Sequence, residues 1–224
     1  MGAAEEELMT LDVPRLSAPT SGFKHRLAAI VIRLAGWTTD GAPPALPRLV
    51  VIAAPHTSLM DGFWMNAFAW YWGIEFNWLV RKSMTSGPLG YWLRYTGAVP
   101  IDRENPAGLI AELVQAFKTH AHLFLALSPE GTRSRRTHWK SGFYRLSQAA
   151  GVPMCLSFLD YTRKRAGFGP CMKASGSVSA DMDFIRAFYK DIQGKFPGQF
   201  TPPRLPEEDR SPAPRAASGP ARPR

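Results

Sequence analysis

Along the middle of this chain, segments patterned like buried strands alternate with segments patterned like helices, and no internal repeat interrupts the alternation. This order is typical of a single α/β domain, in which strands are connected through helices. The expected strands cover 49–53, 74–80, 97–101, 123–127 and 152–159, with an edge pairing over 173–178 as a further candidate. The expected helices cover 23–37, 62–72, 106–117, 142–150 and a stretch that opens at Asp181. Gly151 is expected to end the fourth of these helices in a left-handed cap.

The two ends of the chain have a different composition from the middle. Residues 1–21 are acidic and then rich in Pro, Ser and Thr, so we predict a flexible lead-in. Residues 197–224 are rich in proline and arginine and are predicted to be a disordered tail. The folded domain is therefore expected to occupy residues 22–196.

The charge balance narrows the class of partner. Lysine and arginine number 27 against 18 acidic residues, which gives a formal charge of +9. An anionic partner is therefore expected, although charge alone does not distinguish nucleic acid, anionic lipid and phosphorylated substrates. The sequence has no signature of a nucleic-acid-binding module, so no nucleic-acid partner is expected.

The cysteines and the first residues indicate the cellular compartment in which we expect the protein. Cys155 and Cys171 are too few for a disulfide framework and lack paired metal-ligand spacing, which favours a reducing compartment. Glu5, Glu6 and Glu7 stand where a secretory signal would need a basic region, so export is not expected. A cytoplasmic location follows from these two features.

Residues 23–37 leave two interpretations open. The longest apolar run, 27–32, is far shorter than the ~20 residues that a spanning helix needs. On a helical wheel the apolar side chains of 23–37 share one side, with Arg26 and Arg33 at its edge. The segment is either an interfacial helix that docks on lipid or an ordinary surface helix that covers the core.

His56 and Asp61 form the first candidate catalytic pair. Five residues of helix turn through about 500°, so the two side chains can meet only if His56 lies in the loop and Asp61 in the first turn of the helix. An aspartate that accepts one imidazole N–H leaves the other nitrogen free to act as a general base. Since no serine or cysteine stands in a nucleophile elbow, the attacking group is expected to be a substrate hydroxyl. The alternative is a structural His56 that caps the helix.

Two arginines follow strands farther along the chain. Arg103 follows the expected strand 97–101, and Arg133 lies in the loop after 123–127. Loops at the ends of parallel strands hold ligands in α/β proteins. Two guanidinium groups can grip a phosphate, and Gly131 would let the backbone approach it closely.

Four segments together resemble the blocks of the phospholipid/glycerol acyltransferase family, the PlsC-type enzymes. His56–Asp61 resembles the H-x-x-x-x-D block, 97–103 the block that ends in arginine, 129–134 the P-E-G-T-R-S block, and 151–154 the fourth block. The blocks also occur in the family's order. The resemblance implies a glycerolipid acyltransferase-like fold, with a mixed, largely parallel sheet flanked by helices.

The resemblance also implies roles for individual residues. His56 would be the base and Asp61 would orient it. The residues expected to bind the acceptor substrate are Arg103, Glu130, Gly131, Thr132 and Arg133. Because an ionised Glu130 cannot grip phosphate, we expect it to hold Arg103 or Arg133 in place, while Pro153 is expected to shape the site from behind.

The implied activity is transfer of a fatty acyl group from acyl-CoA or acyl-ACP to the hydroxyl of a lysophospholipid, with 1-acyl-sn-glycerol 3-phosphate as the first expected acceptor. No metal or bound cofactor is expected. Peripheral attachment to the inner face of an anionic membrane is expected, with acyl carrier protein as an alternative donor partner. Two alternatives stay open: the same chemistry on glycerol 3-phosphate or another lysolipid, and a catalytically decayed basic protein that binds lipid or nucleic acid.

Overall fold

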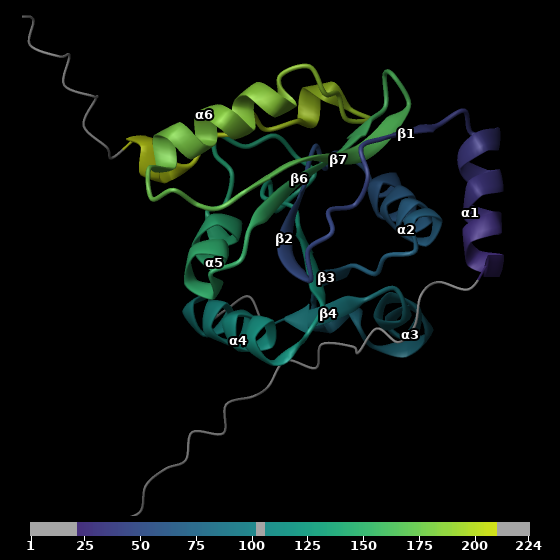
Figure 1. The fold of residues 1–224 in the computed structure, drawn as a ribbon, viewed down its shortest axis with the longest axis horizontal. Coiled ribbons are helices and arrows are strands. Elements are labelled where there is room, and N and C mark those ends of the chain that lie inside the picture. Colours follow the sequence, from purple (N-terminus) through teal and green to yellow (C-terminus); the bar gives the residue numbers. More distant parts are fainter. Residues whose placement is uncertain (1–21, 102–105, 210–224) are drawn as a thin grey trace, which may run out of the picture.

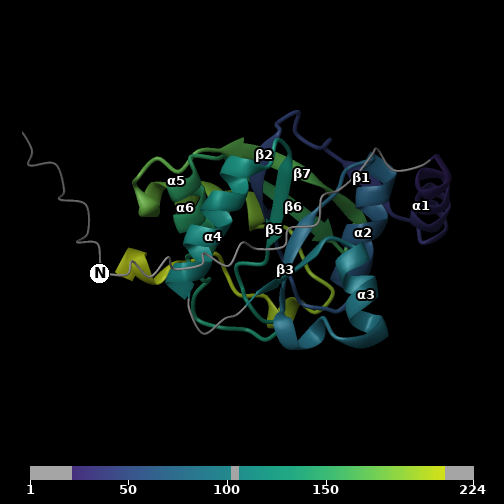
Figure 2. The same ribbon diagram turned by 90° about the horizontal axis from the view of Figure 1, so that it is seen from below.

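A computed structural model describes residues 22–101 and 106–209 (Figures 1 and 2). Within these residues the strands form one seven-stranded sheet in the order β1-β7-β6-β2-β5-β3-β4. Neighbouring strands run parallel except β6 and β7, which are antiparallel. The predicted α/β class with a mixed, largely parallel sheet is therefore confirmed. The strands are β1 (Thr38–Asp40), β2 (Arg48–Ala53), β3 (Asn77–Arg81), β4 (Ala98–Ile101), β5 (Leu123–Leu127), β6 (Met154–Asp160) and β7 (Arg165–Met172).

Helices cover both faces of this sheet (Figures 1 and 2). They are α1 (Gly22–Leu34), α2 (Met60–Trp72), α3 (Gly87–Tyr95), α4 (Pro106–Thr119), α5 (Gly142–Ala150) and α6 (Val178–Tyr189). Helices α1 and α2 lie on one face, and α4, α5 and α6 lie on the other. Gly151 ends α5 with φ 66°, as its position in the sequence predicts.

Strand β2 lies at the centre of the sheet and contributes to the core on both faces. Val50 and Ile52 pack among the residues of α4, α5 and α6, whereas Leu49 and Val51 point to the α2 side. This is the two-residue alternation of a strand. Because both faces are covered, β2 reads in the sequence as a continuous apolar run.

Several elements differ from the sequence-based expectation. Residues 173–178, expected to pair at the sheet edge, form no strand; the last strand is β7, at Arg165–Met172. Strand β1 and helix α3 are not predicted from the sequence. Strands β1 and β7 and helix α3 contain or adjoin glycines and depend on contacts with neighbouring segments. Their sequence patterns are therefore weak.

The segment after α6 corrects the predicted tail. The sequence predicts disorder from Pro197 onward, but residues 197–209 form the short turns η2 (Pro197–Gln199) and η3 (Pro206–Asp209). Leu205 is 0% exposed and belongs to the main core. The core is therefore not complete at α6, because this proline-rich segment packs on the domain. The expected lead-in, 1–21, and residues 210–224 lie outside the described residues.

The two cysteines are bonded to each other. Cys155 on β6 and Cys171 on β7 are opposite one another in the antiparallel pair, with their Cα atoms 4.0 Å apart, and they form a disulfide. The prediction of a reducing compartment rests on unpaired cysteines and loses that support. Sequence reasoning misses the pairing because it does not place a strand at β7.

Helix α1 leaves an apolar stripe in solvent. Ala28 and Ile32 face the protein, while Phe23 is 75% and Leu34 83% exposed, with Leu27 and Ile30 between them on the exposed stripe. In the described part of the chain, no helix combines the length and hydrophobicity that crossing a bilayer requires.

Candidate active site

The pairing of β2 with β5 brings two sequence motifs together. The strands are adjacent and parallel, with Ile52 opposite Leu127, so the loops that follow them leave the same edge of the sheet. The first loop carries His56 and the second carries Ser128 to Arg133. The backbone N–H of His56 donates to Oε1 of Glu130 at 2.5 Å, a contact that joins residues 74 positions apart.

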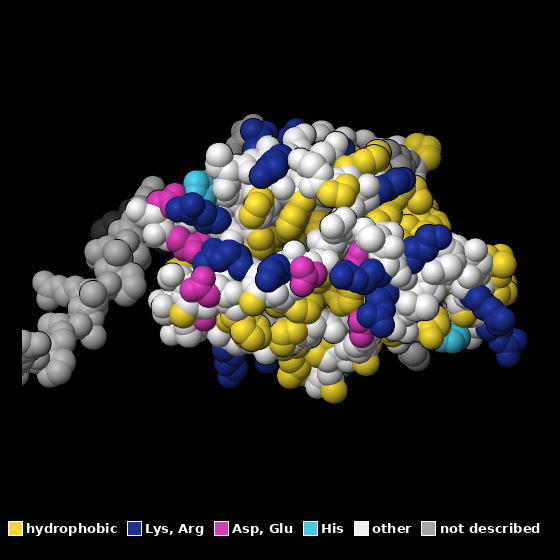
Figure 3. All heavy atoms as spheres, turned by 90° about the horizontal axis from the view of Figure 1, so that it is seen from above, with side chains coloured by type: hydrophobic (Ala, Val, Ile, Leu, Met, Phe, Trp, Pro, Cys, Tyr) yellow, Lys and Arg dark blue, Asp and Glu magenta, His cyan; other side chains and the backbone are white. Residues whose placement is uncertain are grey.

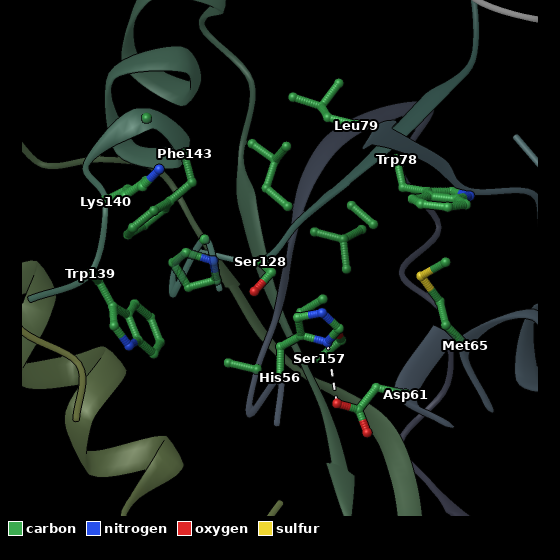
Figure 4. Close-up of a pocket in the computed structure, with 18 of the residues that line it drawn as sticks. His56, Asp61, Met65, Trp78, Leu79, Ser128, Trp139, Lys140, Phe143 and Ser157 are labelled. Atoms are coloured by element: carbon green, nitrogen blue, oxygen red, sulfur yellow. Dashed lines mark ion pairs between the residues drawn. The ribbon is translucent and has the colours of Figure 1, made fainter. Parts of the chain in front are cut away.

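His56 and Asp61 have the geometry that the spacing predicts. His56 lies in the loop after β2, Asp61 lies in the first turn of α2, and Nδ1 of His56 is 3.2 Å from Oδ2 of Asp61 (Figure 4). The Asp61 side chain is 6% exposed and that of His56 is 30% exposed. The carboxylate thus fixes the tautomer of the imidazole and leaves Nε2 for a substrate proton.

Further donors hold the Asp61 carboxylate. Its Oδ2 accepts the backbone N–H groups of Thr57 and Ser58, both at 2.9 Å, and its Oδ1 accepts the Tyr161 hydroxyl at 2.6 Å. Burial by itself raises the pKa of Asp61, but the hydrogen bonds from His56, Tyr161 and Ser58 outweigh it and lower the pKa below its usual value. The carboxylate is therefore ionised and fixed in orientation near neutral pH.

Glu130 binds two backbone donors. Its carboxyl group is buried and accepts the N–H of His56 on one oxygen and the N–H of Thr201, at 3.1 Å, on the other. Among the described residues Glu130 forms no ion pair with Arg133, and its other predicted partner, Arg103, lies outside them, so that half of the expectation stays a prediction. Burial raises the pKa of Glu130 to about 7, although the two backbone hydrogen bonds act in the opposite direction.

The segment after α6 supports both loops. The N–H of Phe196 donates to Oγ1 of Thr57 at 3.2 Å, and Trp139 Nε1 donates to the carbonyl of Thr201 at 2.7 Å. In the orientation that satisfies its neighbours, the Gln199 amide nitrogen donates to the carbonyls of Arg133 and Thr57. A segment beyond every recognisable motif therefore fixes the motif loops relative to each other.

The P-E-G-T-R-S loop turns tightly beside His56. Gly131 has φ 64°, and its N–H donates to the carbonyl of Ser128 at 3.1 Å. The positive φ is what favours glycine here, because the atoms nearest to an added Cβ belong to the flexible end of the Lys140 side chain. Thr132 and Arg133 follow and line the same cavity as His56. In the described residues, neither the Arg133 nor the Lys140 side chain forms an ion pair.

Two other predicted residues are not placed at the site. Arg103 lies outside the described residues. Pro153 precedes β6, and its carbonyl accepts the N–H of Val50 near the start of β2. It does not line the cavity beside His56, and its expected role of shaping the site from behind stays a prediction.

The site opens into a cavity of about 1300 Å³ (Figure 4). Most of its lining is apolar and includes Met65, Trp78, Leu79, Leu113, Phe143 and Phe168. Its basic lining consists of Arg81, Arg133, Lys140 and Arg145 in addition to the histidines. The cavity can therefore accommodate a long apolar group and an anionic group near one imidazole.

Sequence reasoning misses three residues of this site: Ser128, Tyr161 and Thr201. Tyr161 directly follows β6, which is parallel to β2, so its position after a buried strand is the signal that could have found it. Ser128 begins the same loop as Glu130 and has the same signal. No sequence signal identifies Thr201, because it lies in a proline-rich segment.

Comparisons with known proteins agree with this geometry. A model of the acyltransferase family, described as "Acyltransferase", matches residues 43–155, half of the chain. The crystal structure of the 1-acyl-sn-glycerophosphate (LPA) acyltransferase PlsC from Thermotoga maritima has a similar fold, with a TM-score of 0.53 at 15% identity, over 75% of this chain and 76% of that chain. No protein among the curated sequences matches significantly. Since the family match spans both motif loops and the pairing of β2 with β5 that unites them, the chain belongs to the acyltransferase family.

Proposed function

We propose that this acyltransferase moves a fatty acyl group from an acyl-CoA or acyl-ACP thioester to the hydroxyl of a lysophospholipid, with 1-acyl-sn-glycerol 3-phosphate as the primary acceptor. The observation that carries the proposal is the contact of His56 Nδ1 with Asp61, at the wall of a large apolar cavity. A histidine oriented by an aspartate beside such a cavity suits proton abstraction from a hydroxyl that the substrate brings.

The chemistry follows from the position of His56. Nε2 takes the proton of the acceptor hydroxyl as that oxygen bonds to the thioester carbonyl carbon. The tetrahedral intermediate then re-forms the carbonyl, breaks the carbon–sulfur bond, and releases a thiolate that accepts the proton from His56. Asp61 stabilises the imidazolium between these two transfers.

The cavity supports the choice of substrates. Its apolar lining suits a fatty acyl chain, while Arg133 and Lys140 on the adjoining loop have no carboxylate partner among the described residues and can meet a phosphate. The Thermotoga maritima protein of similar fold is a 1-acyl-sn-glycerophosphate acyltransferase, and this likeness supports the same acceptor for this chain.

We also propose that the protein binds peripherally to an anionic membrane, through the exposed stripe of α1 and the aromatic residues of α3. Trp92 and Tyr95 are more than half exposed, and Lys24 of α1 lies 4.9 Å over the Tyr95 ring, so the two helices touch at this point. Across the face in Figure 3, acidic side chains lie between the basic ones, while α1 at its right end combines apolar and basic side chains. This combination is typical of interfacial binding.

The first test measures free thiol released from palmitoyl-CoA, with and without 1-acyl-sn-glycerol 3-phosphate in detergent micelles. Wild type should release thiol only with acceptor, and His56→Ala should abolish the release. Glycerol 3-phosphate, other lysolipids and acyl-ACP form the remaining arms. Absence of release in every arm would contradict the proposed activity.

The second test addresses the phosphate. Arg133→Ala should raise the acceptor KM far more than it lowers kcat, because the guanidinium binds a part of the acceptor that does not react. The matched control is Arg165→Ala, because Arg165 pairs with Asp40 and does not line the cavity, so this variant should change neither constant. An equal effect of both variants would contradict the assignment.

The membrane proposal is tested by sedimentation with vesicles of phosphatidylcholine and phosphatidylglycerol. Leu34→Glu should reduce the bound fraction, because Leu34 is an exposed member of the α1 stripe. Thr38→Glu changes an exposed position of β1 in the same way and should leave binding unchanged. Equal binding by both variants and wild type would overturn the proposal.

A further inference from the structure

One buried polar atom at the site has no partner in the described structure. Oγ of Ser128 is inaccessible to solvent, yet it neither donates nor accepts a hydrogen bond there. Leaving a buried hydroxyl unpaired costs stability, and nearly all such groups in folded proteins are satisfied. The unpaired hydroxyl of Ser128 is therefore an exception with a physical cost.

Ser128 is placed where a reacting group would lie. It directly follows β5, the strand that pairs with β2. It lines the same cavity as His56. Figure 4 shows the Ser128 hydroxyl and the His56 ring on the walls of this one cavity. The hydroxyl has no hydrogen bond to break, so rotation about its Cα–Cβ bond would turn it toward the space that substrate would occupy.

A second serine provides an internal comparison. Ser157 lies on β6, on the other side of β2, opposite Ala53, and also lines the cavity. Its hydroxyl donates to the carbonyl of Ile52 at 3.0 Å, so it is satisfied within the protein. Two serines thus flank the end of β2, and only Ser128 keeps its donor available.

We propose that the Ser128 hydroxyl donates a hydrogen bond to the thioester carbonyl oxygen, on which negative charge develops during acyl transfer. This inference rests on the proposed function. The acyl carbonyl is a polar group that must enter a mostly apolar cavity, whereas Arg133 and Lys140, on the loop beyond, suit the phosphate. A hydroxyl that donates to the carbonyl oxygen in a site that excludes water stabilises the developing oxyanion.

In this step, each bond that forms is matched by a bond that breaks. The acceptor oxygen bonds to the carbonyl carbon and gives its proton to Nε2 of His56, while the carbonyl π electrons move to the oxygen that faces Ser128. Collapse returns that electron pair, breaks the carbon–sulfur bond and sends the proton from His56 to the departing thiolate. Ser128 donates a hydrogen bond throughout and does not transfer its proton.

The experiment compares wild type with Ser128→Ala, Ser128→Thr and Ser157→Ala in the thiol-release assay, alongside thermal unfolding. Ser128→Ala should lower kcat and kcat/KM together, by about 10²- to 10³-fold, because the hydrogen bond strengthens only in the transition state. Its melting temperature should equal or exceed that of wild type, since it removes an unpaired buried hydroxyl. Ser128→Thr, which keeps a hydroxyl, should recover most of the activity.

Ser157→Ala is the matched control. It should lower the melting temperature, because the Ile52 carbonyl loses one of its two side-chain donors and keeps only the Tyr189 hydroxyl, and it should lower kcat far less than Ser128→Ala does. Should Ser128→Ala not fold, Ser128→Gly also removes the hydroxyl and is expected to show the same loss of kcat.

Three results would overturn the proposal: Ser128→Ala activity within about threefold of wild type, a raised KM with unchanged kcat, or an equal loss of kcat in Ser157→Ala. The two proposals fail in different ways. Absence of thiol release by wild type contradicts the proposed function, whereas an active wild type with an equally active Ser128→Ala contradicts only the role of Ser128.

Discussion

The hydroxyl of Tyr161 donates a 2.6 Å hydrogen bond to Oδ1 of Asp61, which precedes it by 100 residues. The Tyr161 ring also packs edge-on against Trp37, with 5.1 Å between the ring centroids. Because Tyr161 engages one carboxylate oxygen, the other stays directed at Nδ1 of His56. Under the proposed function, Tyr161 is therefore a positioning residue that would act on His56 through Asp61.

Tyr161→Phe should lower kcat by about 10- to 100-fold with little change in either KM, because a misoriented carboxylate weakens the base and not substrate binding. The phenylalanine keeps the ring that packs on Trp37, so the melting temperature should stay close to that of wild type. The measurement is steady-state kinetics in the wild-type and Asp61→Ala backgrounds. If Tyr161→Phe lowers kcat by the same factor in both backgrounds, Tyr161 does not act through Asp61.

Glu130→Gln tests the raised pKa of this carboxyl group. Because the pKa rises from 4.5 to about 7 on folding, the group stabilises the fold fully below pH 4.5, and this contribution is lost as the pH rises through 7. The total is about 3 kcal/mol, from about 1.4 kcal/mol per tenfold change in proton affinity.

The glutamine variant lacks this titration and leaves one of the two backbone donors poorly paired. Wild type should therefore be more stable than Glu130→Gln at pH 5, and the difference should shrink toward pH 8. Urea unfolding at several pH values measures it. A difference that grows with pH would show that Glu130 titrates with a lowered pKa in the folded protein.

Leu205→Ala should lower the free energy of unfolding by about 2–5 kcal/mol, as expected for a fully buried leucine. The control is Leu34→Ala, because Leu34 is 83% exposed and should contribute little. Denaturant unfolding of both variants makes the comparison. Equal, small effects would return residues 197–209 to the disordered tail that composition predicts.

The disulfide should contribute about 3 kcal/mol, since Cys155 and Cys171 are separated by 16 residues. Adding a phosphine reductant should therefore lower the melting temperature of wild type by roughly 5–10 °C. The double variant Cys155→Ala and Cys171→Ala should not respond to reductant. Two alkylatable thiols in the unreduced, denatured protein would contradict the bond.

The sequence predicts the part of the site that is local. The apolar run of β2, the proline loop and the helix after it place His56 against Asp61, and five residues of spacing suffice to test whether they meet. The P-E-G-T-R-S loop is also predicted from local sequence, because it directly follows a buried strand. Arg103 stays a prediction, since the structure does not describe it.

What the sequence does not predict depends on contacts between distant segments. Strand β7 contains two glycines and a proline, and a Cβ at Gly167 would lie 1.4 Å from the carbonyl oxygen of Asp40, so the glycine serves the approach of β1. The backbone N–H partners of Glu130 are not predicted from the sequence, because backbone groups leave no trace in side-chain chemistry. The segment with Thr201 and Leu205 resembles a tail by composition, although it is packed.

The contact between Thr201 and Glu130 also has a consequence for how the protein becomes active during synthesis. A nascent chain exposed only through residue 155, the end of the family match, already contains His56, Asp61 and Glu130. It lacks Tyr161, β7 and the segment that supports both loops. Since parallel pairing requires distant residues to meet, we expect the motif residues to acquire their final geometry only after residue 201 has left the ribosome. Under the proposed function, competence for acyl transfer is then expected late in the folding of this chain.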